Sequence, residues 1–337
     1  MREALPIMRN QNLLIINSLS CFISILMFTG CSHEASPDKT AQDTTQDPPV
    51  PTAPAGPVVL TEQDIHERLK KNNPDYQNNA EFGKQKGEII SAKLVGVEDI
   101  SALKGMKLQF LDLMNCPVSD LRPLKGMDLQ YLDLTHCPVT DLSPLKGMKI
   151  QELYLEGSFV SDLSPLQGMP IRILRMEHTP VSEISPLEGM PLNQLNLFDT
   201  KVKNLGLINT LPLKTLWIPN TEIIDISPLK GMLLESLDIQ DTKVADLSPL
   251  RGMQFLRLNL ANSAVTDLTP LKGMPLQRLI FTPANITKGM DVIRDNPSIQ
   301  GLGASFDTVK AADEFWKEYD AAQTKPEKEK PEKQKTE

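Results

Sequence analysis

Apolar residues recur along the middle of the chain with a period of 21 residues. The Gly-Met pairs show this period most plainly, from Gly105 to Gly273. In each period two apolar positions stand two residues apart, as at Leu111 and Leu113, and such alternation predicts a strand with one buried face. The first position is leucine throughout: Leu111, Leu132, Leu153, Leu174, Leu195, Leu216, Leu237, Leu258 and Leu279. The middle of the chain is therefore a repeat array with one strand in each period.

The rest of each repeat predicts a short helical turn on the opposite side from the strand. Most repeats carry Ser/Thr-Pro-Leu, as at Ser143 to Leu145, and a proline can open a helical turn because its missing N–H would have no partner there. One repeat buries too little apolar surface to offset its ordering entropy, so the repeats must stack around a shared core. Ile90 and Ala92 fit the two strand columns one period earlier, which predicts ten strands.

These residues carry a family resemblance. The segment from Leu108 to Val118, LQFLDLMNCPV, matches the leucine-rich-repeat consensus, and Val139 to Leu145 resembles the internalin-type class. The repeats are one residue shorter than those of internalins and often have threonine in place of asparagine, as at Thr179 and Thr200. They are more similar to bacterial extracytoplasmic leucine-rich-repeat proteins with Leu-Lys-Gly-Met repeats. The resemblance implies an α/β repeat solenoid with a parallel β-sheet on the concave face, short 3₁₀ turns on the convex face and helical caps.

Composition and pattern divide the chain into six segments. We expect a lipoprotein signal peptide at 1–30, a disordered tether at 31–60, an N-terminal cap at 61–88, the solenoid at 89–287, a C-terminal cap at 288–322 and a disordered charged tail at 323–337. Thr61 is placed to cap a short helix with Ile65 and Leu69 on one face. A second capping helix is expected around Phe315, and the sequence Gly-Leu-Gly at 301–303 is interpreted as a turn.

The N-terminal segment predicts secretion. The apolar run from Leu13 to Phe28 follows two arginines and is shorter than the roughly 20 residues of a membrane-spanning helix. It leads into Phe28-Thr29-Gly30-Cys31, which resembles a bacterial lipobox, although phenylalanine replaces the usual small aliphatic residue. The resemblance implies a lipid on Cys31 that anchors the protein in the bacterial cell envelope, at the outer rather than the inner membrane, because serine follows the cysteine. The alternative is an incidental cysteine after a signal or anchor.

The sequence contains few candidates for nucleic-acid-binding, metal-binding or catalytic residues. A formal net charge of −8 argues against nucleic acid as a partner. The four histidines lack metal-ligand spacing, and neither a nucleophile elbow, a phosphate-binding loop nor a kinase motif occurs. We therefore predict no catalytic residue, no metal, no cofactor and no enzymatic activity.

Two repeated columns receive structural interpretations. Cys116 and Cys137 stand one period apart, where two buried thiols are expected and a disulfide is the alternative. An aspartate column is expected to satisfy backbone groups of the turns. Its members are Asp120, Asp141, Asp162, Asp225, Asp246 and Asp267.

The outward strand positions differ from repeat to repeat, and we expect the functional residues there. There the sequence predicts an aromatic band with one arginine, formed by Tyr131, Tyr154, Arg175, Phe198 and Trp217. Tyr, Trp and Arg are enriched at binding hot spots. The leading hypothesis is a non-catalytic module that binds an unknown protein ligand on its concave face. The alternatives are a regulatory partner of an extracytoplasmic Ser/Thr kinase system, and a glycan-binding adhesin or structural spacer.

Overall fold

The computed structural model describes residues 60–324, so the predicted signal peptide, Cys31 and the charged tail lie outside the described residues. The described helices are α2 (Glu62–Asn72), α3 (Met290–Arg294) and α4 (Ala312–Gln323). The strands are β1 (Glu81–Gln85), β2 (Glu88–Lys93), β3 (Phe110–Asp112), β4 (Tyr131–Asp133), β5 (Glu152–Tyr154), β6 (Ile173–Arg175), β7 (Gln194–Asn196), β8 (Thr215–Trp217), β9 (Ser236–Asp238), β10 (Arg257–Asn259), β11 (Arg278–Ile280), β12 (Gly301–Gly303) and β13 (Lys310–Ala311). These strands form one sheet in the order of the sequence.

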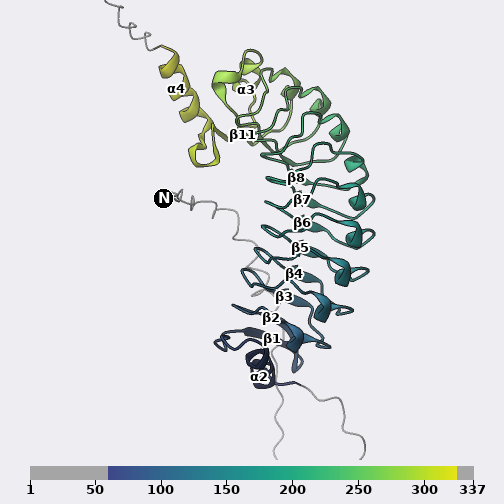
Figure 1. Ribbon diagram of the computed structural model, residues 1–337. Coiled ribbons are helices and arrows are strands. Elements are labelled where there is room, and N and C mark those ends of the chain that lie inside the picture. The colour runs from purple at the N-terminus through teal and green to yellow at the C-terminus, as the bar shows by residue number, and fades with distance from the viewer. Residues whose placement is uncertain (1–59, 325–337) are drawn as a thin grey trace, which may run out of the picture. The chain divides into compact units, whose positions relative to one another are not determined.

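Short 3₁₀ turns line the side of the solenoid opposite the sheet (Figure 1). They are η2 (Ser101–Leu103), η3 (Arg122–Leu124), η4 (Ser143–Leu145), η5 (Ser164–Leu166), η6 (Ser185–Leu187), η7 (Ile208–Thr210), η8 (Ser227–Leu229), η9 (Ser248–Leu250) and η10 (Thr269–Leu271), with η11 (Pro283–Asn285) and η12 (Phe306–Thr308) near the C-terminal cap. Figure 1 shows the strands stacked on the concave side and the turns on the convex side.

The sheet is parallel from β2 to β12, and antiparallel strands β1 and β13 close its two ends. Leu111 pairs with Leu132, and Leu132 with Leu153, so the leucine column runs straight through the stack. All nine of these leucines are buried, with at most 2% of their surface exposed. The predicted leucine-rich-repeat solenoid is therefore confirmed, and its core lies between the sheet and the 3₁₀ turns.

The first repeat departs from the predicted register. Ala92, not Ile90, pairs with Leu111, a separation of 19 residues instead of 21. Leu94 takes the next inward position and is 1% exposed. The prediction was wrong because β2 belongs to a hairpin with β1, whose own register sets where β2 enters the sheet.

The sheet also has more strands than the ten that the columns predict, because the hairpin adds β1 and the C-terminal cap adds β12 and β13. The Gly-Leu-Gly segment is strand β12 and not a turn: Leu302 is buried and pairs with Leu279.

Left-handed backbone explains two sequence columns. In each Gly-Met pair from Gly105 to Gly273, the glycine follows a 3₁₀ turn and has φ between 69° and 80°, a region that favours glycine. A second column, after each strand, has φ between 51° and 66°. It holds Asn115, His136, Gly157, His178, Asp199, Asn220, Asp241 and Asn262, which are the residue types that best tolerate this conformation.

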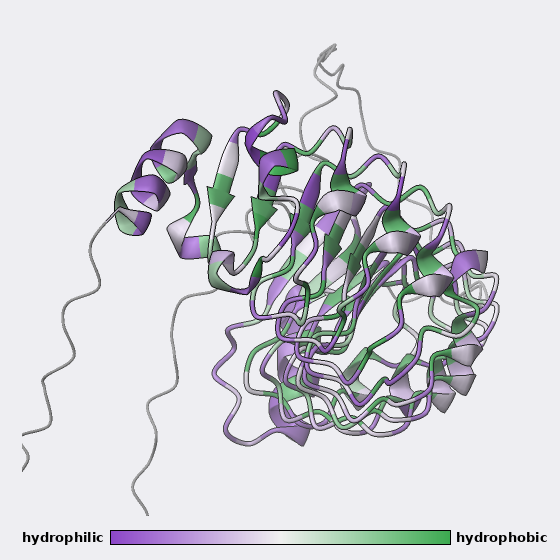
Figure 2. Ribbon diagram, turned by 90° about the horizontal axis from the view of Figure 1, so that it is seen from above, coloured by the Kyte–Doolittle hydropathy of each residue, from purple (hydrophilic) through white to green (hydrophobic). Residues whose placement is uncertain are grey.

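Both predicted cap helices are present. Thr61 and Asp64 form a capping box at the start of α2, which buries Ile65 and Leu69. At the other end, Phe315 of α4 lies 5.8 Å from Phe281 between ring centroids, and Figure 2 shows α4 as mostly hydrophilic with short hydrophobic patches. Within residues 60–324 no helix has the length and apolarity needed to cross a bilayer.

Candidate binding surface

The outward strand positions form three columns on the concave side of the sheet, and we call their side chains the concave face. The first column runs from Phe110 through Tyr131 and Glu152 to Arg278, and the second from Asp112 through Tyr154 and Arg175 to Ile280. The third column lies just beyond the strands, where Leu113 N–H bonds Asp133 O and Asn115 N–H bonds Thr135 O, so the parallel ladder continues past the strand ends. Neighbouring rungs lie about 4.8 Å apart, so a partner on this face would contact several repeats.

The predicted aromatic band is not continuous. The rings of Tyr131 and Tyr154 lie 5.3 Å apart, and the guanidinium carbon of Arg175 is 5.9 Å from the Tyr154 ring centroid. Phe198 instead packs edge-on against His178, at 4.7 Å between ring centroids. Trp217 lies half-buried on β8, without a ring contact among the described residues. The five residues share one face, but only the first three form a continuous stack.

Arg175 belongs to a polar cluster that the sequence did not reveal, formed with Glu177 and Asn196 and called the central cluster below. Its Nε and Nη2 donate to Glu177 Oε1 at 2.8 and 2.7 Å, and Asn196 Nδ2 donates to the same oxygen at 2.6 Å. The Arg175 side chain is 33% exposed, whereas the Glu177 side chain is only 5% exposed. The buried carboxylate therefore fixes the orientation of an accessible guanidinium group.

Glu177 is unusual because its second oxygen has no donor. Within residues 60–324, Oε2 is one of two buried side-chain polar atoms without a hydrogen-bond partner. Burial raises the pKa of this carboxyl group, and the charge of Arg175 opposes that rise. A buried acceptor left without a donor costs about 1–3 kcal/mol, so stability alone does not account for this glutamate.

Two tyrosines and two carboxylates form a second group beside the central cluster, which we call the quartet. In the sheet register Tyr131 pairs with Glu152, and Asp133 with Tyr154. Each phenol donates along its own strand, Tyr131 to Asp133 Oδ2 and Tyr154 to Glu152 Oε2, both at 3.2 Å. Burial, and then the neighbouring negative charge, raises the pKa of both phenols. The hydroxyls therefore act as hydrogen-bond donors.

The cysteines carry no evident reactivity. Cys116 and Cys137 are free and buried, as expected for two thiols, and their Sγ atoms donate to Leu94 O and Leu113 O. Burial raises the pKa of Cys137 to about 12. A protonated thiol is a poor nucleophile and a poor metal ligand.

The histidines of the left-handed column do not form a metal site. His136 lies over Gly157, where an added Cβ would come within 2.3 Å of His136 Nδ1. His178 Nδ1 is 2.8 Å from Asp199 Oδ2. Among residues 60–324 no group of three His, Cys, Asp or Glu side chains is arranged to hold a metal ion.

The aspartate column serves the turns, as predicted. Each Oδ1 accepts the backbone N–H two residues later at 2.7–2.9 Å for Asp120, Asp141, Asp162, Asp225, Asp246 and Asp267. We call these six residues the turn ladder.

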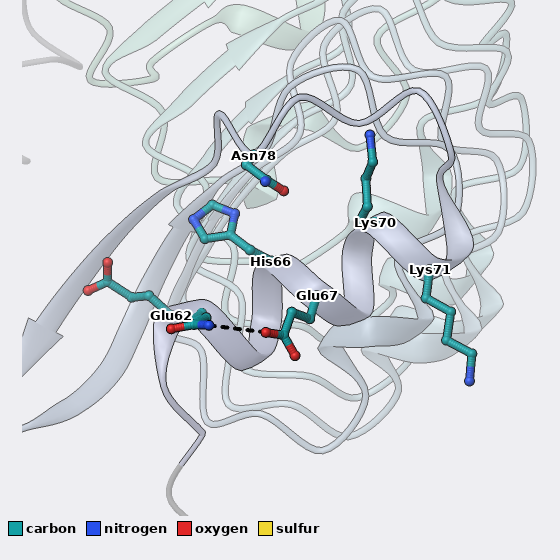
Figure 3. Close-up of a pocket in the computed structure, with 7 residues that line it drawn as sticks. Glu62, His66, Glu67, Lys70, Lys71 and Asn78 are labelled. Atoms are coloured by element: carbon teal, nitrogen blue, oxygen red, sulfur yellow. Dashed lines mark hydrogen bonds between the residues drawn. The ribbon is translucent and has the colours of Figure 1, made fainter.

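A hollow of about 740 Å³ lies beside α2 (Figure 3). It is lined by Glu62, Gln63, His66, Glu67, Lys70, Lys71 and Asn78. Much of this lining is used within the cap: His66 Nδ1 lies 2.7 Å from the Tyr76 hydroxyl, Lys70 Nζ donates to Tyr76 O, and Gln63 donates to Glu67. The two bonds to Tyr76 hold α2 against the following loop, and the Gln63–Glu67 bond lies within the helix, so these contacts have a structural role.

No protein-family model and no curated protein matches the sequence. Among solved structures, the internalin InlF from Listeria monocytogenes is 20% identical, over 72% of this chain and 89% of that one, with a TM-score of 0.53. Internalin C2 from the same species is 21% identical over 67% and 95% of the two chains, with a TM-score of 0.43. The likeness to InlF agrees with the repeat geometry, and the fold is an internalin-like leucine-rich-repeat solenoid.

Proposed function

We propose that this chain is a non-catalytic protein-binding module, anchored to the cell envelope by a lipid on Cys31, that holds its partner on the concave face. The central cluster carries this proposal. Arg175 lies near the middle of the sheet, is oriented by a buried carboxylate and contacts an aromatic ring. An arginine fixed in this way loses little side-chain entropy on binding, and arginine is common at the centres of protein interfaces.

The remaining donors of Arg175 support the same conclusion. None of the hydrogen bonds formed within residues 60–324 uses its Nη1. That nitrogen can donate to a carboxylate or carbonyl oxygen of a partner, while Tyr154 and Trp217 supply flat apolar area on either side. A polar centre flanked by aromatic side chains is the usual composition of a protein-binding hot spot.

A double substitution tests the placement of the site. Tyr154→Ala with Trp217→Ala should weaken capture of the partner in a pull-down without lowering the melting temperature. Phe159→Ala is the matched control. Phe159 is an aromatic residue that is 61% exposed, but it lies two residues after Gly157 and is not part of the three concave columns. Undiminished capture by the double variant would refute the site.

The anchor is a separate part of the proposal. It is supported by the four residues from Phe28 to Cys31, and by Ser32 for the outer membrane. Cells grown with radioactive palmitate should label the wild-type chain but not Cys31→Ser. Equal labelling of the two would show that the lipid is not on this cysteine.

A further inference from the structure

Charge is distributed unevenly along the concave face. In the three concave columns, five carboxylates and only two basic groups lie between β2 and the positions just after β6. The carboxylates are Asp112, Asp133, Glu152, Glu156 and Glu177, and the basic groups are Lys93 and Arg175. The outward columns of β7 and β8 carry no charged residue.

The carboxylates of the quartet lack cationic partners. Neither Asp133 nor Glu152 forms an ion pair within residues 60–324, and each instead accepts a tyrosine hydroxyl. A tyrosine ring attracts a cation to its face, and adjacent carboxylates strengthen that attraction. The quartet is therefore suited to the ammonium or guanidinium group of an incoming side chain.

Glu177 provides a second, independent observation on the same half of the face. Its side chain is 95% buried, its Oε2 has no donor, and its charge is coupled to that of Glu156 on the preceding repeat. This half therefore holds an acceptor that its own residues do not satisfy, next to carboxylates that its own cations do not neutralise.

The opposite end of the face has the opposite sign. Arg257 and Arg278 stand side by side in the register of β10 and β11, and both are exposed. Neither guanidinium group pairs with a carboxylate in the part of the chain that the structure describes. Two like charges on adjacent strands disfavour the isolated sheet, and an acidic ligand would relieve that repulsion.

We propose that the partner is a protein that lays lysine or arginine side chains over the quartet and acidic side chains over Arg257 and Arg278, so that charge fixes its direction along the sheet. This inference rests on the proposed function and adds the chemistry of the partner. Six strand spacings separate the two charge centres, about 29 Å, which roughly nine residues of extended chain would span.

A bipolar peptide tests the inference directly. It carries three lysines and three glutamates, joined by a Gly/Ser spacer that sets the charge centres about nine residues apart. A photo-crosslinker at the lysine end should attach to β3–β6, and one at the glutamate end should attach to β10–β12. The reversed pattern, or the same products from both ends, would overturn the proposal.

Affinity for the fluorescent peptide at low ionic strength supplies the second readout. Asp133→Asn with Glu152→Gln keeps oxygen acceptors for both phenols, and should weaken binding about five- to tenfold. Arg257→Gln with Arg278→Gln should have a similar effect. Glu183→Gln with Glu188→Gln, and Arg251→Gln with Lys272→Gln, change the net charge equally at exposed sites beside the 3₁₀ turns and should leave affinity unchanged.

Two outcomes of the affinity measurement would also overturn the proposal: no binding to the wild type, or equal losses in the control pairs. The result can be separated from the proposed function. If a natural partner is released by Tyr154→Ala with Trp217→Ala but not by either charge pair on the face, the concave site stands and the proposed charge pattern fails.

Discussion

Aspartates of the turn ladder and of the second concave column form the same local hydrogen bond, in which the carboxylate accepts the backbone N–H two residues later. Asp246 in the turn ladder is exposed to solvent, whereas Asp238 in the second column is buried. Asp246 accepts the N–H of Ser248 beside a 3₁₀ turn, and Asp238 accepts the N–H of Gln240 at the end of β9. Hydrogen bonds with Ser248 lower the pKa of exposed Asp246, whereas burial raises the pKa of Asp238 to about 6. Asp246 therefore stabilises the fold through its charge. The charge of Asp238 carries a cost, so stability does not explain why a carboxylate is there.

The largest expected effect on stability comes from comparing an inward-facing and an outward-facing residue of the same strand. Leu195→Ala removes a fully buried member of the leucine column on β7 and should lower the free energy of unfolding by about 2–5 kcal/mol. The adjacent Gln194→Ala faces outward and should change it by about 0.5 kcal/mol or less. Urea unfolding followed by circular dichroism measures both. Similar losses in the two variants would contradict the assigned sides of the strand.

The next effect concerns Asp238. Its folded pKa of about 6 exceeds the unfolded value of 3.8, so the folded chain holds the proton more tightly and this group favours the fold increasingly as pH falls from 6 towards 4. Asp238→Asn removes the cost of the buried charge but also the bond that Asn259 Nδ2 donates to Oδ2. The free energy of unfolding at pH 7 should therefore rise by on the order of 1–2 kcal/mol. The gain should fade near pH 4. A gain that is independent of pH would mean that the carboxyl group does not titrate in this range.

The smallest effect has the opposite sign. At pH 7 Asp246→Asn should lower the urea midpoint slightly, because the amide cannot accept the Ser248 hydroxyl as the second carboxylate oxygen does. The pKa of Asp246 is lowered in the fold, so its stabilising charge is present above the unfolded pKa and is lost as pH falls through the folded pKa. The difference from the wild type should therefore shrink in acid. If Asp246→Asn stabilised the protein at pH 7, the charges of Asp246 and Asp238 would not have opposite effects on the free energy of unfolding.

The period of the sequence predicts the repeated part of the fold because each column has one environment. The period does not predict the two ends of the sheet, where contacts with the caps set the register and the secondary structure. Ala92 takes the place expected for Ile90 because the β1–β2 hairpin sets the register. Gly301 and Gly303 suggest a turn, yet they lie in strand β12, which pairs with β13. The residue just before β13 passes so close that a Cβ at Gly303 would lie 2.9 Å from Val309 Cα.

The candidate site was predictable only in part. Outward position follows from alternation, so the sequence places Tyr131, Tyr154 and Arg175 on one face. The hydrogen-bond partners of Glu177 could not be predicted in the same way, because they are Arg175 on its own repeat and Asn196 on the next. Adjacent side chains in a parallel sheet are set by register, which connects residues about one period apart.

The central claim is that a protein partner occupies the concave face, and site-specific photo-crosslinking in cells tests it most directly. With p-benzoylphenylalanine in place of Gln194 on β7, we expect one discrete product, and with it in place of Ser185 at the start of η6 we expect none. The captured protein, once purified, should bind the wild type more tightly than Tyr154→Ala with Trp217→Ala. No product from position 194, an equal product from position 185, or equal binding to the double variant would contradict the account.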